Sequence, residues 1–179
     1  MAVMDSELQK RASGIRMLVL DVDGVLTDGK LYFDHNGNEL KAFNTRDGMG
    51  IKALQRCGIE VAVITGRKSE AVTQRMTQLG VQHVYQGRED KLNAFLHLLK
   101  ETGLDAQQIC FAGDDWIDLP VLLRAGLAVS VADAEDHVKD RAHWITQRNG
   151  GDGAVREICN LILKAQDKEQ AILDNILTS

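Results

Sequence analysis

Residues 17–28 read MLVLDVDGVLTD, an uninterrupted apolar run followed at once by two aspartates and a glycine. A short apolar run bounded by turn-forming residues is typical of a strand that is buried on both faces. Asp21 and Asp23 are two positions apart, which lets both side chains leave an extended chain on the same side. Gly24 permits the sharp turn that exposes them. The stretch therefore predicts a buried strand that delivers two carboxylates to the edge of a sheet.

Outward from this stretch, short apolar runs alternate with segments of helical periodicity. Such alternation indicates β-α-β units and a parallel sheet. We expect an α/β fold, a doubly wound Rossmann-like parallel sheet with helices on both faces. Further strands are expected at 59–64, 81–85, 109–112 and 127–131, and helices at 48–56, 69–79, 91–101, 120–124 and 154–165, the last one continuing toward Leu177.

A small insert follows the first strand. The turn His35-Asn36-Gly37-Asn38 lies between the short β-rich runs 31–33 and 40–43. Asn-Gly between two such runs is the strongest short-range signal for a β-hairpin. We therefore expect a hairpin over about 31–43 within a main domain at 17–165, preceded by an N-terminal segment, 1–16, and followed by a C-terminal tail, 166–179.

The composition excludes several classes of protein. The chain has 179 residues, the length of a single domain, and 21 Lys plus Arg stand against 26 Asp plus Glu. A net charge of −5 gives no basic footprint for nucleic acid, and no apolar run is long enough to span a bilayer. Cys57, Cys110 and Cys159 show neither disulfide nor zinc spacing. We expect a cytoplasmic protein with neither nucleic-acid nor membrane partners.

Polar side chains follow the ends of three predicted strands, and a lysine opens an intervening helix. Ligands of parallel sheets bind beyond the carboxyl ends of the strands, so these side chains should converge at one edge. The set comprises Asp21, Asp23, Thr65, Lys91, Asp114, Asp115 and Asp118. Their convergence is a sharper signal than any one of them alone.

These residue types are suited to phosphoryl transfer. Asp21, Asp23 and Asp114 would repel one another without a cation, and hard oxygen ligands favour Mg²⁺. One carboxylate can attack phosphorus to form an aspartyl-phosphate, while a second protonates the leaving alkoxide and later deprotonates water. Thr65 and Lys91 can stabilise the phosphoryl oxygens. The sequence therefore indicates a magnesium-dependent phosphatase.

Other interpretations use the same residues. An Asp-x-Asp pair can cap a loop, and Lys91 can be a solvated helix residue. Asp115 and Asp118 can be acidic residues of a first helical turn, where the helix dipole favours negative charge. A signalling receiver domain also combines acids, Thr and Lys, but its phosphoacceptor follows the third strand, near which this chain carries Gly87-Arg88. A catalytically inactive oligomeric scaffold is a third alternative. It is disfavoured because every chemical position is occupied.

Four segments carry a resemblance to a known family: 21–28 (DVDGVLTD), 64–67 (ITGR), Lys91 and 113–118 (GDDWID). They resemble the four motifs of the haloacid dehalogenase-like phosphatase superfamily, over about residues 17–159. The resemblance implies that Asp21 is the nucleophile, that Asp23 is the general acid/base, and that Thr65 and Lys91 bind the phosphoryl group. It also implies that Mg²⁺ is held by Asp21, Asp114 and the Asp23 carbonyl, with Asp115 and Asp118 in support.

The inserts after the first and second motifs are too small for a cap domain, as in the capless members of the superfamily. Residues 43–50 (FNTRDGMG) and 150–157 (GGDGAVRE) are similar to the 3-deoxy-D-manno-octulosonate 8-phosphate phosphatases of lipopolysaccharide synthesis. This resemblance implies a homotetramer in which hairpins pair and tails reach adjacent sites. The implied substrate contacts are Asp23, Asn44, Thr45, Arg46, Asp47, Gly48, Lys52, Arg67, Arg75 and Lys91.

Three points stay open at this level. A nonulosonate 9-phosphate is an alternative substrate, because a related capless module accompanies acylneuraminate cytidylyltransferases, a domain this chain lacks. Lys52 and Arg75 fit a solvated helix face as well as a binding surface for carboxylate and phosphate. Asp152 stands where the resemblance leads us to expect a basic residue, so the contribution of 150–153 to substrate binding is open.

Overall fold

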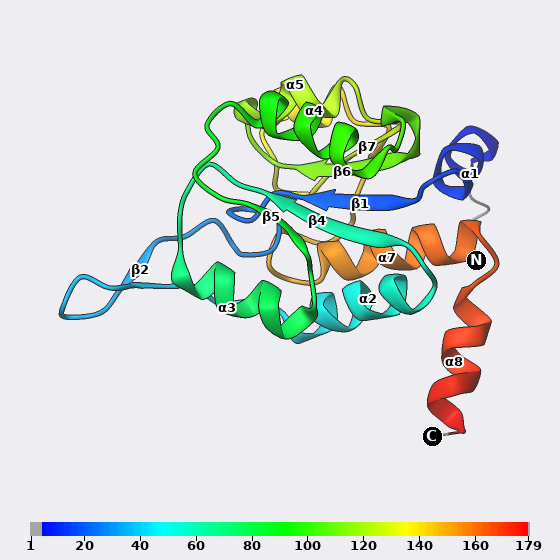
Figure 1. Cartoon of the computed structure of the whole chain (residues 1–179), viewed down its shortest axis with the longest axis horizontal. Helices are drawn as coiled ribbons and strands as arrows, with labels where there is room; N and C mark the ends of the chain where they lie inside the picture. The colour runs from blue at the N-terminus through cyan, green and yellow to red at the C-terminus, as the bar shows by residue number, and fades with distance from the viewer. Residues whose placement is uncertain (1–4, 179) are drawn as a thin grey trace.

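A six-stranded parallel sheet lies between layers of helices in the computed structural model, which describes residues 5–178 (Figure 1). The strand order is β5-β4-β1-β6-β7-β8, and every neighbouring pair is parallel. The strands are β1 (Met17–Leu20), β4 (Glu60–Ile64), β5 (His83–Tyr85), β6 (Ile109–Gly113), β7 (Leu127–Ser130) and β8 (Trp144–Ile145). The doubly wound α/β fold class is thereby confirmed.

Helices cover both faces of the sheet (Figure 1). One face carries α2 (Thr45–Arg56), α3 (Glu70–Leu79) and α7 (Ala154–Ala165), and the other carries α4 (Lys91–Thr102) and α5 (Leu119–Leu122). Shorter elements complete the chain: α1 (Ser6–Ser13), η1 (Ala106–Gln108), η2 (Trp116–Asp118), α6 (Asp136–Lys139) and α8 (Glu169–Leu177). Within residues 5–178, no helix combines the length and the apolar character needed to cross a membrane.

The central strands are buried on both sides, as their apolar sequences predict. All four residues of β1 and all five of β6 are buried. The pairing of β1 places Leu20 level with Val63 of β4 and Ala112 of β6. Because these strands end at nearly the same height, the residues that follow them share one edge of the sheet.

The hairpin insert projects from that same edge (Figure 1). Its strands are β2 (Tyr32–Phe33) and β3 (Glu39–Leu40), joined through a turn in which Gly37 has a φ of +81°. Strand β3 begins one residue earlier and is shorter than the run 40–43 that the sequence predicts. The apolar side chains Leu31, Tyr32, Phe33 and Leu40 are exposed on it.

The predicted continuation of the last helix to Leu177 is wrong. Helix α7 ends at Ala165, and Asp167 adopts a φ of +55°, the one positive value outside glycine within residues 5–178. A left-handed residue ends a helix, so α8 starts anew at Glu169 and projects from the body, at the end of the sheet opposite the hairpin (Figure 1). Apolar periodicity continues across the break, which is why the pattern alone does not reveal it.

Gly126 offers a test of the packing between the start of β7 and η1, the short helix that precedes β6. A Cβ at this position would lie 2.1 Å from the carbonyl oxygen of Gln107, a main-chain atom that cannot rotate away. We expect Gly126→Ala to lower the free energy of unfolding by about 1–3 kcal/mol, measured by urea denaturation. Gly14→Ala is the matched control, because its Cβ would meet its nearest neighbour at an ordinary 3.7 Å. Equal stability of the two variants would contradict this account.

Candidate active site

The turn after β1 brings two carboxylates to the edge of the sheet. The backbone N–H of Asp21 donates to the carbonyl of Ala112 at 3.0 Å, and those of Leu26 and Thr27 donate back to that of Val22. Gly24 has a φ of +92°, and a Cβ there would lie 2.0 Å from Asp114 Oδ2. Glycine is required at this position because the turn packs directly against the carboxylate that follows β6.

A buried lysine lies between two carboxylates. Lys91, the first residue of α4, places its Nζ 2.8 Å from Asp21 Oδ1 and 2.6 Å from Asp118 Oδ1, and its side chain is fully buried. Burial on its own would lower the pKa of Lys91, but the attraction of Asp21 and Asp118 outweighs it and raises the pKa. The ammonium group is therefore held charged at the carboxyl end of β1.

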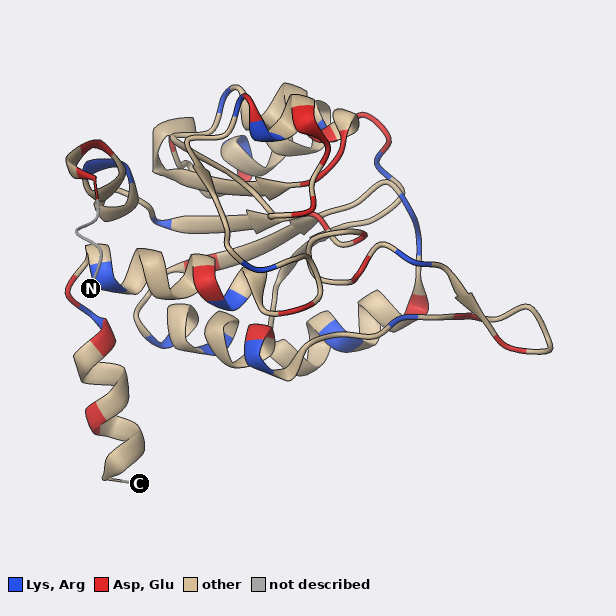
Figure 2. Ribbon diagram, turned by 180° about the vertical axis from the view of Figure 1, so that it is seen from behind, with Lys and Arg blue, Asp and Glu red and all other residues tan. Residues whose placement is uncertain are grey.

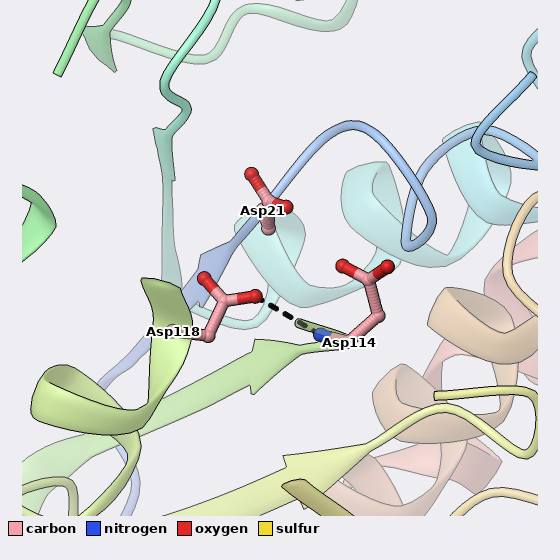
Figure 3. Close-up of side chains that lie close together, drawn as sticks. All are labelled: Asp21, Asp114 and Asp118. Carbon is pink, nitrogen blue, oxygen red and sulfur yellow. Dashed lines mark hydrogen bonds between the residues drawn. The ribbon is translucent and has the colours of Figure 1, made fainter. Parts of the chain in front are cut away.

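Asp118 is committed to protein contacts on both oxygens. Its Oδ2 accepts the backbone N–H of Asp114 at 3.0 Å (Figure 3). The same oxygen accepts the N–H of Asp115 at 3.2 Å, while Oδ1 accepts from Lys91. Asp115 in turn accepts the N–H of Trp116 and caps η2. Asp118 thus fixes the loop after β6, and Asp115 begins the short helix that carries it.

Asp21, Asp114 and Asp118 each place a carboxylate oxygen within 4.8 Å of the others (Figure 3). Asp114 Oδ1 is buried and has no hydrogen-bond partner within the described residues. Burial first, and the neighbouring carboxylates second, raise the pKa of Asp21 and of Asp114 well above the ordinary value. A hard divalent cation would relieve both effects, so the donor set fits such an ion. Asp114 has the freer oxygen, because those of Asp118 are engaged.

Thr65 and Arg67 follow β4 at the same edge. Thr65 is buried, its N–H donates to the carbonyl of Tyr85 at 2.9 Å, and its hydroxyl makes no hydrogen bond within residues 5–178. Arg67 is half-exposed and approaches Asp23, with Nε 4.0 Å from Oδ2. The structure therefore brings two of the predicted ligand-binding side chains to the edge that carries Asp21.

Two residues of the hairpin reach this edge that the sequence reasoning missed. Lys41 Nζ contacts Asp23 Oδ1 and lies 3.0 Å from Glu39 Oε1, and Arg67 Nη2 donates to the same Glu39 oxygen at 3.0 Å. The sequence held a signal for this contact, because an insert that directly follows β1 has to return to the same edge of the sheet. Glu39 and Lys41, two positions apart, leave an extended strand on one side.

The predicted contacts on α2 behave differently. Asn44 caps α2 by accepting the N–H of Arg46, and Asp47 is buried, accepting the N–H of Arg156 at 2.7 Å near the start of α7. Burial raises the pKa of Asp47 to about 6, and its Oδ2 has no partner within the described residues. Asp47 therefore faces α7, where it supports the packing of two helices.

The remaining predicted contacts lie along α2 and α3. The guanidinium of Arg75 covers Gly48, where a Cβ would meet Nη2 at 2.4 Å, and Lys52 is exposed. Within residues 5–178, no hydrogen bond or ion pair links Asn44, Thr45, Arg46, Asp47, Gly48, Lys52 or Arg75 to Asp21 or Asp23. Within one chain, these residues therefore make no polar contact with the two aspartates in the part of the chain that the structure describes.

The glycine-rich segment 150–153 packs against the turn of its own chain. The N–H of Gly151 donates to the carbonyl of Val25 at 3.0 Å, and a Cβ on Gly150 would lie 1.6 Å from the Gly24 carbonyl oxygen. Asp152 is exposed. Gly150 and Gly151 thus support the turn that carries Asp21 and Asp23, while the side chain of Asp152 remains accessible.

Comparison with known proteins agrees with this geometry. Residues 82–158 match a family model described as haloacid dehalogenase-like hydrolase. The 3-deoxy-D-manno-octulosonate 8-phosphate phosphatase of Yersinia pestis is 49% identical over 166 residues, which cover 93% of this chain and 88% of that protein.

Two solved structures extend the comparison. The phosphatase of the same description from Moraxella catarrhalis, in complex with a magnesium ion, a phosphate ion and a KDO molecule, has a TM-score of 0.94 and 40% identity over 96% of this chain and 99% of that one. The cobalt-bound phosphatase from Haemophilus influenzae has a TM-score of 0.86 and 41% identity over 88% and 92%. The chain therefore belongs to the haloacid dehalogenase-like hydrolases, within the family of 3-deoxy-D-manno-octulosonate 8-phosphate phosphatases.

Proposed function

We propose that this chain is a Mg²⁺-dependent phosphatase that hydrolyses 3-deoxy-D-manno-octulosonate 8-phosphate to the free sugar acid and phosphate, in lipopolysaccharide biosynthesis. The observation that carries the proposal is the buried Lys91 between Asp21 and Asp118, beside the partnerless oxygen of Asp114. This arrangement suits a dianionic phosphoryl group. The relatives named above supply the substrate class.

In the first step, an oxygen of Asp21 attacks phosphorus and the bond from phosphorus to the sugar oxygen breaks. The sugar oxygen takes a proton from Asp23, so that the products are an aspartyl-phosphate and a neutral alcohol. Lys91 favours the attack because its positive charge, fixed beside Asp21 Oδ1, stabilises the negative charge that accumulates on the phosphoryl oxygens. The hydroxyl of Thr65 is available as a donor to the same oxygens.

In the second step, Asp23 takes a proton from a water molecule, which attacks the phosphorus of the aspartyl-phosphate. The acyl-phosphate bond breaks, phosphate leaves, and the Asp21 carboxylate is restored with Asp23 protonated for the next cycle. Asp118 holds Lys91 and the loop of Asp114 in place through both steps. The same carboxyl group of Asp23 thus gives a proton and takes one back.

Asp21, Asp114 and the backbone carbonyl of Asp23 would hold Mg²⁺, with Asp118 and Asp115 fixing the loop behind them. When bound, the ion supplies positive charge that offsets the repulsion between the carboxylates and the phosphoryl group. The buried Oδ1 of Asp114, which has no hydrogen-bond partner within the described residues, supports this assignment.

Selectivity for a sugar acid needs cations beyond the phosphoryl site. Arg67 lies at the correct edge, and Lys91 serves the phosphoryl group. The contacts predicted on α2 and α3, from Asn44 to Gly48 with Lys52 and Arg75, would serve an adjacent subunit of a cytoplasmic homotetramer. The open edge around Asp23, with no cap domain, supports a site that a neighbouring subunit completes. A nonulosonate 9-phosphate is the alternative substrate.

Asp21→Asn tests the nucleophile. An amide oxygen is a poor nucleophile, so phosphate release from 3-deoxy-D-manno-octulosonate 8-phosphate in Mg²⁺ should fall at least about 10³-fold, as measured by a phosphate assay. Asp28→Asn is the matched control, since Asp28 is exposed and bonds Tyr32 at the hairpin base. Preferred turnover of a nonulosonate 9-phosphate by the wild type would keep the mechanism and replace the substrate.

The carboxylate repulsion predicts a pH-dependent stability of the metal-free protein. Asp21 and Asp114 have a raised pKa in the folded state, so their contribution to stability is complete below the ordinary carboxyl pKa and is lost as the pH rises through the raised one. The midpoint of thermal unfolding in EDTA should therefore fall as the pH rises from about 5 to 8. Adding Mg²⁺ should raise that midpoint most at the upper end of the range.

Asp114→Asn is expected to remove both effects. The variant should be more stable than the wild type in EDTA at pH 8, because one of the repelling charges is gone, and it should gain little from Mg²⁺. Asp140→Asn, the same change at an exposed aspartate whose side chain makes no hydrogen bond or ion pair within residues 5–178, should behave as the wild type does. A normal Mg²⁺-induced shift of the unfolding midpoint in Asp114→Asn would contradict the assignment of Asp114 to the metal.

A further inference from the structure

Four charged side chains meet at the base of the hairpin and form what we call the hairpin-base cluster: Asp23, Glu39, Lys41 and Arg67. They come from three segments: the turn after β1, the second strand of the hairpin with the residue beyond it, and the loop after β4. Two positive and two negative charges balance one another. The cluster joins the insert to the carboxyl group proposed as acid and base.

Lys41 is the buried member of this cluster. Its side chain is 1% exposed, although its backbone is accessible, and its Nζ contacts Asp23 Oδ1 and Glu39 Oε1. A lysine in a hairpin insert ordinarily extends into solvent, as Lys30 does with a side chain 72% exposed. Burying an ammonium group is unfavourable unless carboxylates accompany it. The two acidic partners therefore fix Lys41 at one place.

Glu39, in the second strand of the hairpin, also restrains the side chain of Lys41. It accepts from Lys41 and from Arg67, each at 3.0 Å, through the same oxygen. Burial would raise the pKa of Glu39, but the two cations outweigh burial and lower it, so the side chain is ionised. Lys41 is thus held between a carboxylate of the insert and the carboxylate of Asp23.

The two oxygens of Asp23 are in different environments. Oδ1 is occupied by Lys41, whereas Oδ2 lies 4.0 Å from Arg67 Nε and makes no hydrogen bond within residues 5–178. A carboxyl group that exchanges a proton with a substrate oxygen needs one oxygen free and a fixed orientation. The contact with Lys41 provides the orientation and leaves Oδ2 available.

We propose that Lys41 is a positioning residue, which holds the Asp23 carboxyl group in the orientation needed for proton transfer and is itself held by Glu39. The inference rests on the proposed function, because it assigns to Asp23 the proton given to the leaving sugar oxygen. The hairpin insert therefore takes part in the chemistry. Without Lys41, the Asp23 side chain regains its rotameric freedom while Glu39 repels it.

Two phosphate esters separate positioning from general support of the fold. An alkyl phosphate such as 3-deoxy-D-manno-octulosonate 8-phosphate leaves as a strongly basic alkoxide, which needs the proton from Asp23. The leaving group of p-nitrophenyl phosphate is a stable phenolate, which leaves without it. The kcat/KM value reports the step up to formation of the aspartyl-phosphate for both esters, so their ratio isolates the proton donation.

Lys41→Met should lower kcat/KM for the alkyl phosphate about 10- to 100-fold, mostly through kcat. The value for p-nitrophenyl phosphate should change by less than about threefold, because that ester does not need the proton. Lys41→Arg, which keeps the charge and donors, should restore part of the loss, and Lys30→Met should match the wild type on both esters. Equal losses on the two esters, or no loss on either, would overturn the proposal.

Asp23→Asn supplies the reference pattern. It should also affect the alkyl phosphate far more than the aryl one, and adding Lys41→Met to it should cause little further loss, because both changes act through the same carboxyl group. Additive losses in the double variant would overturn the proposal. If Lys41→Met does not fold, Glu39→Gln carries the test, with a smaller loss confined to the alkyl phosphate; an equal loss on both esters would again overturn it.

The failure of this inference is distinguishable from failure of the proposed function. Wild-type protein that releases no phosphate from either ester, or an Asp21→Asn variant as active as the wild type, would sink the function itself. An Asp23→Asn variant with the expected pattern beside a Lys41→Met variant without it would leave the function intact and remove the role of Lys41 alone.

Discussion

The ion pairs of the buried Lys91 with Asp21 and Asp118 are the interaction on which the rest of the site depends. Lys91 is the first residue of α4 and forms an ion pair with Asp21, which follows β1. Asp118 approaches the same ammonium group from the segment after β6. Burying an ammonium group is unfavourable unless both carboxylates accompany it. The ion pairs therefore hold together the segments that follow β1, β5 and β6. Asp118 then uses its second oxygen to fix Asp114.

This arrangement carries an excess of negative charge, because one lysine lies among three carboxylates. Burial first and neighbouring carboxylates second disfavour Asp21 and Asp114 as anions, and Lys91 compensates only in part. A site with this excess is stabilised by a divalent cation, whose positive charge would also offset the negative charge of an incoming phosphoryl group. Figure 2 shows acidic segments gathered on the loops at the end of the sheet from which the hairpin projects. The net negative charge of the chain does not prevent it from binding an anionic substrate, because the positive charge that the substrate needs is supplied at the site itself, by Lys91 and a bound cation.

The hairpin connects this chemistry to the surface. Its outer side chains Leu31, Phe33 and Leu40 are exposed and apolar, whereas Glu39 and Lys41 turn inward to Asp23. The insert therefore has two faces: polar side chains that contact Asp23 and Arg67, and apolar side chains that remain exposed.

Five strands of the sheet, their ends and the residues that gather there could be predicted from the sequence, because buried parallel strands appear as continuous apolar runs. The edge strand β8 (Trp144–Ile145) is not predicted, because it has only two residues and no apolar run marks it. The sequence by itself also determined the hairpin, through Asn36-Gly37. Only the tertiary structure decided that Asp47 faces α7, that the last helix breaks at Asp167, and that Lys41 reaches Asp23. The physical reason is common to all three: each depends on a neighbour distant along the chain or on one backbone torsion, and local periodicity records neither.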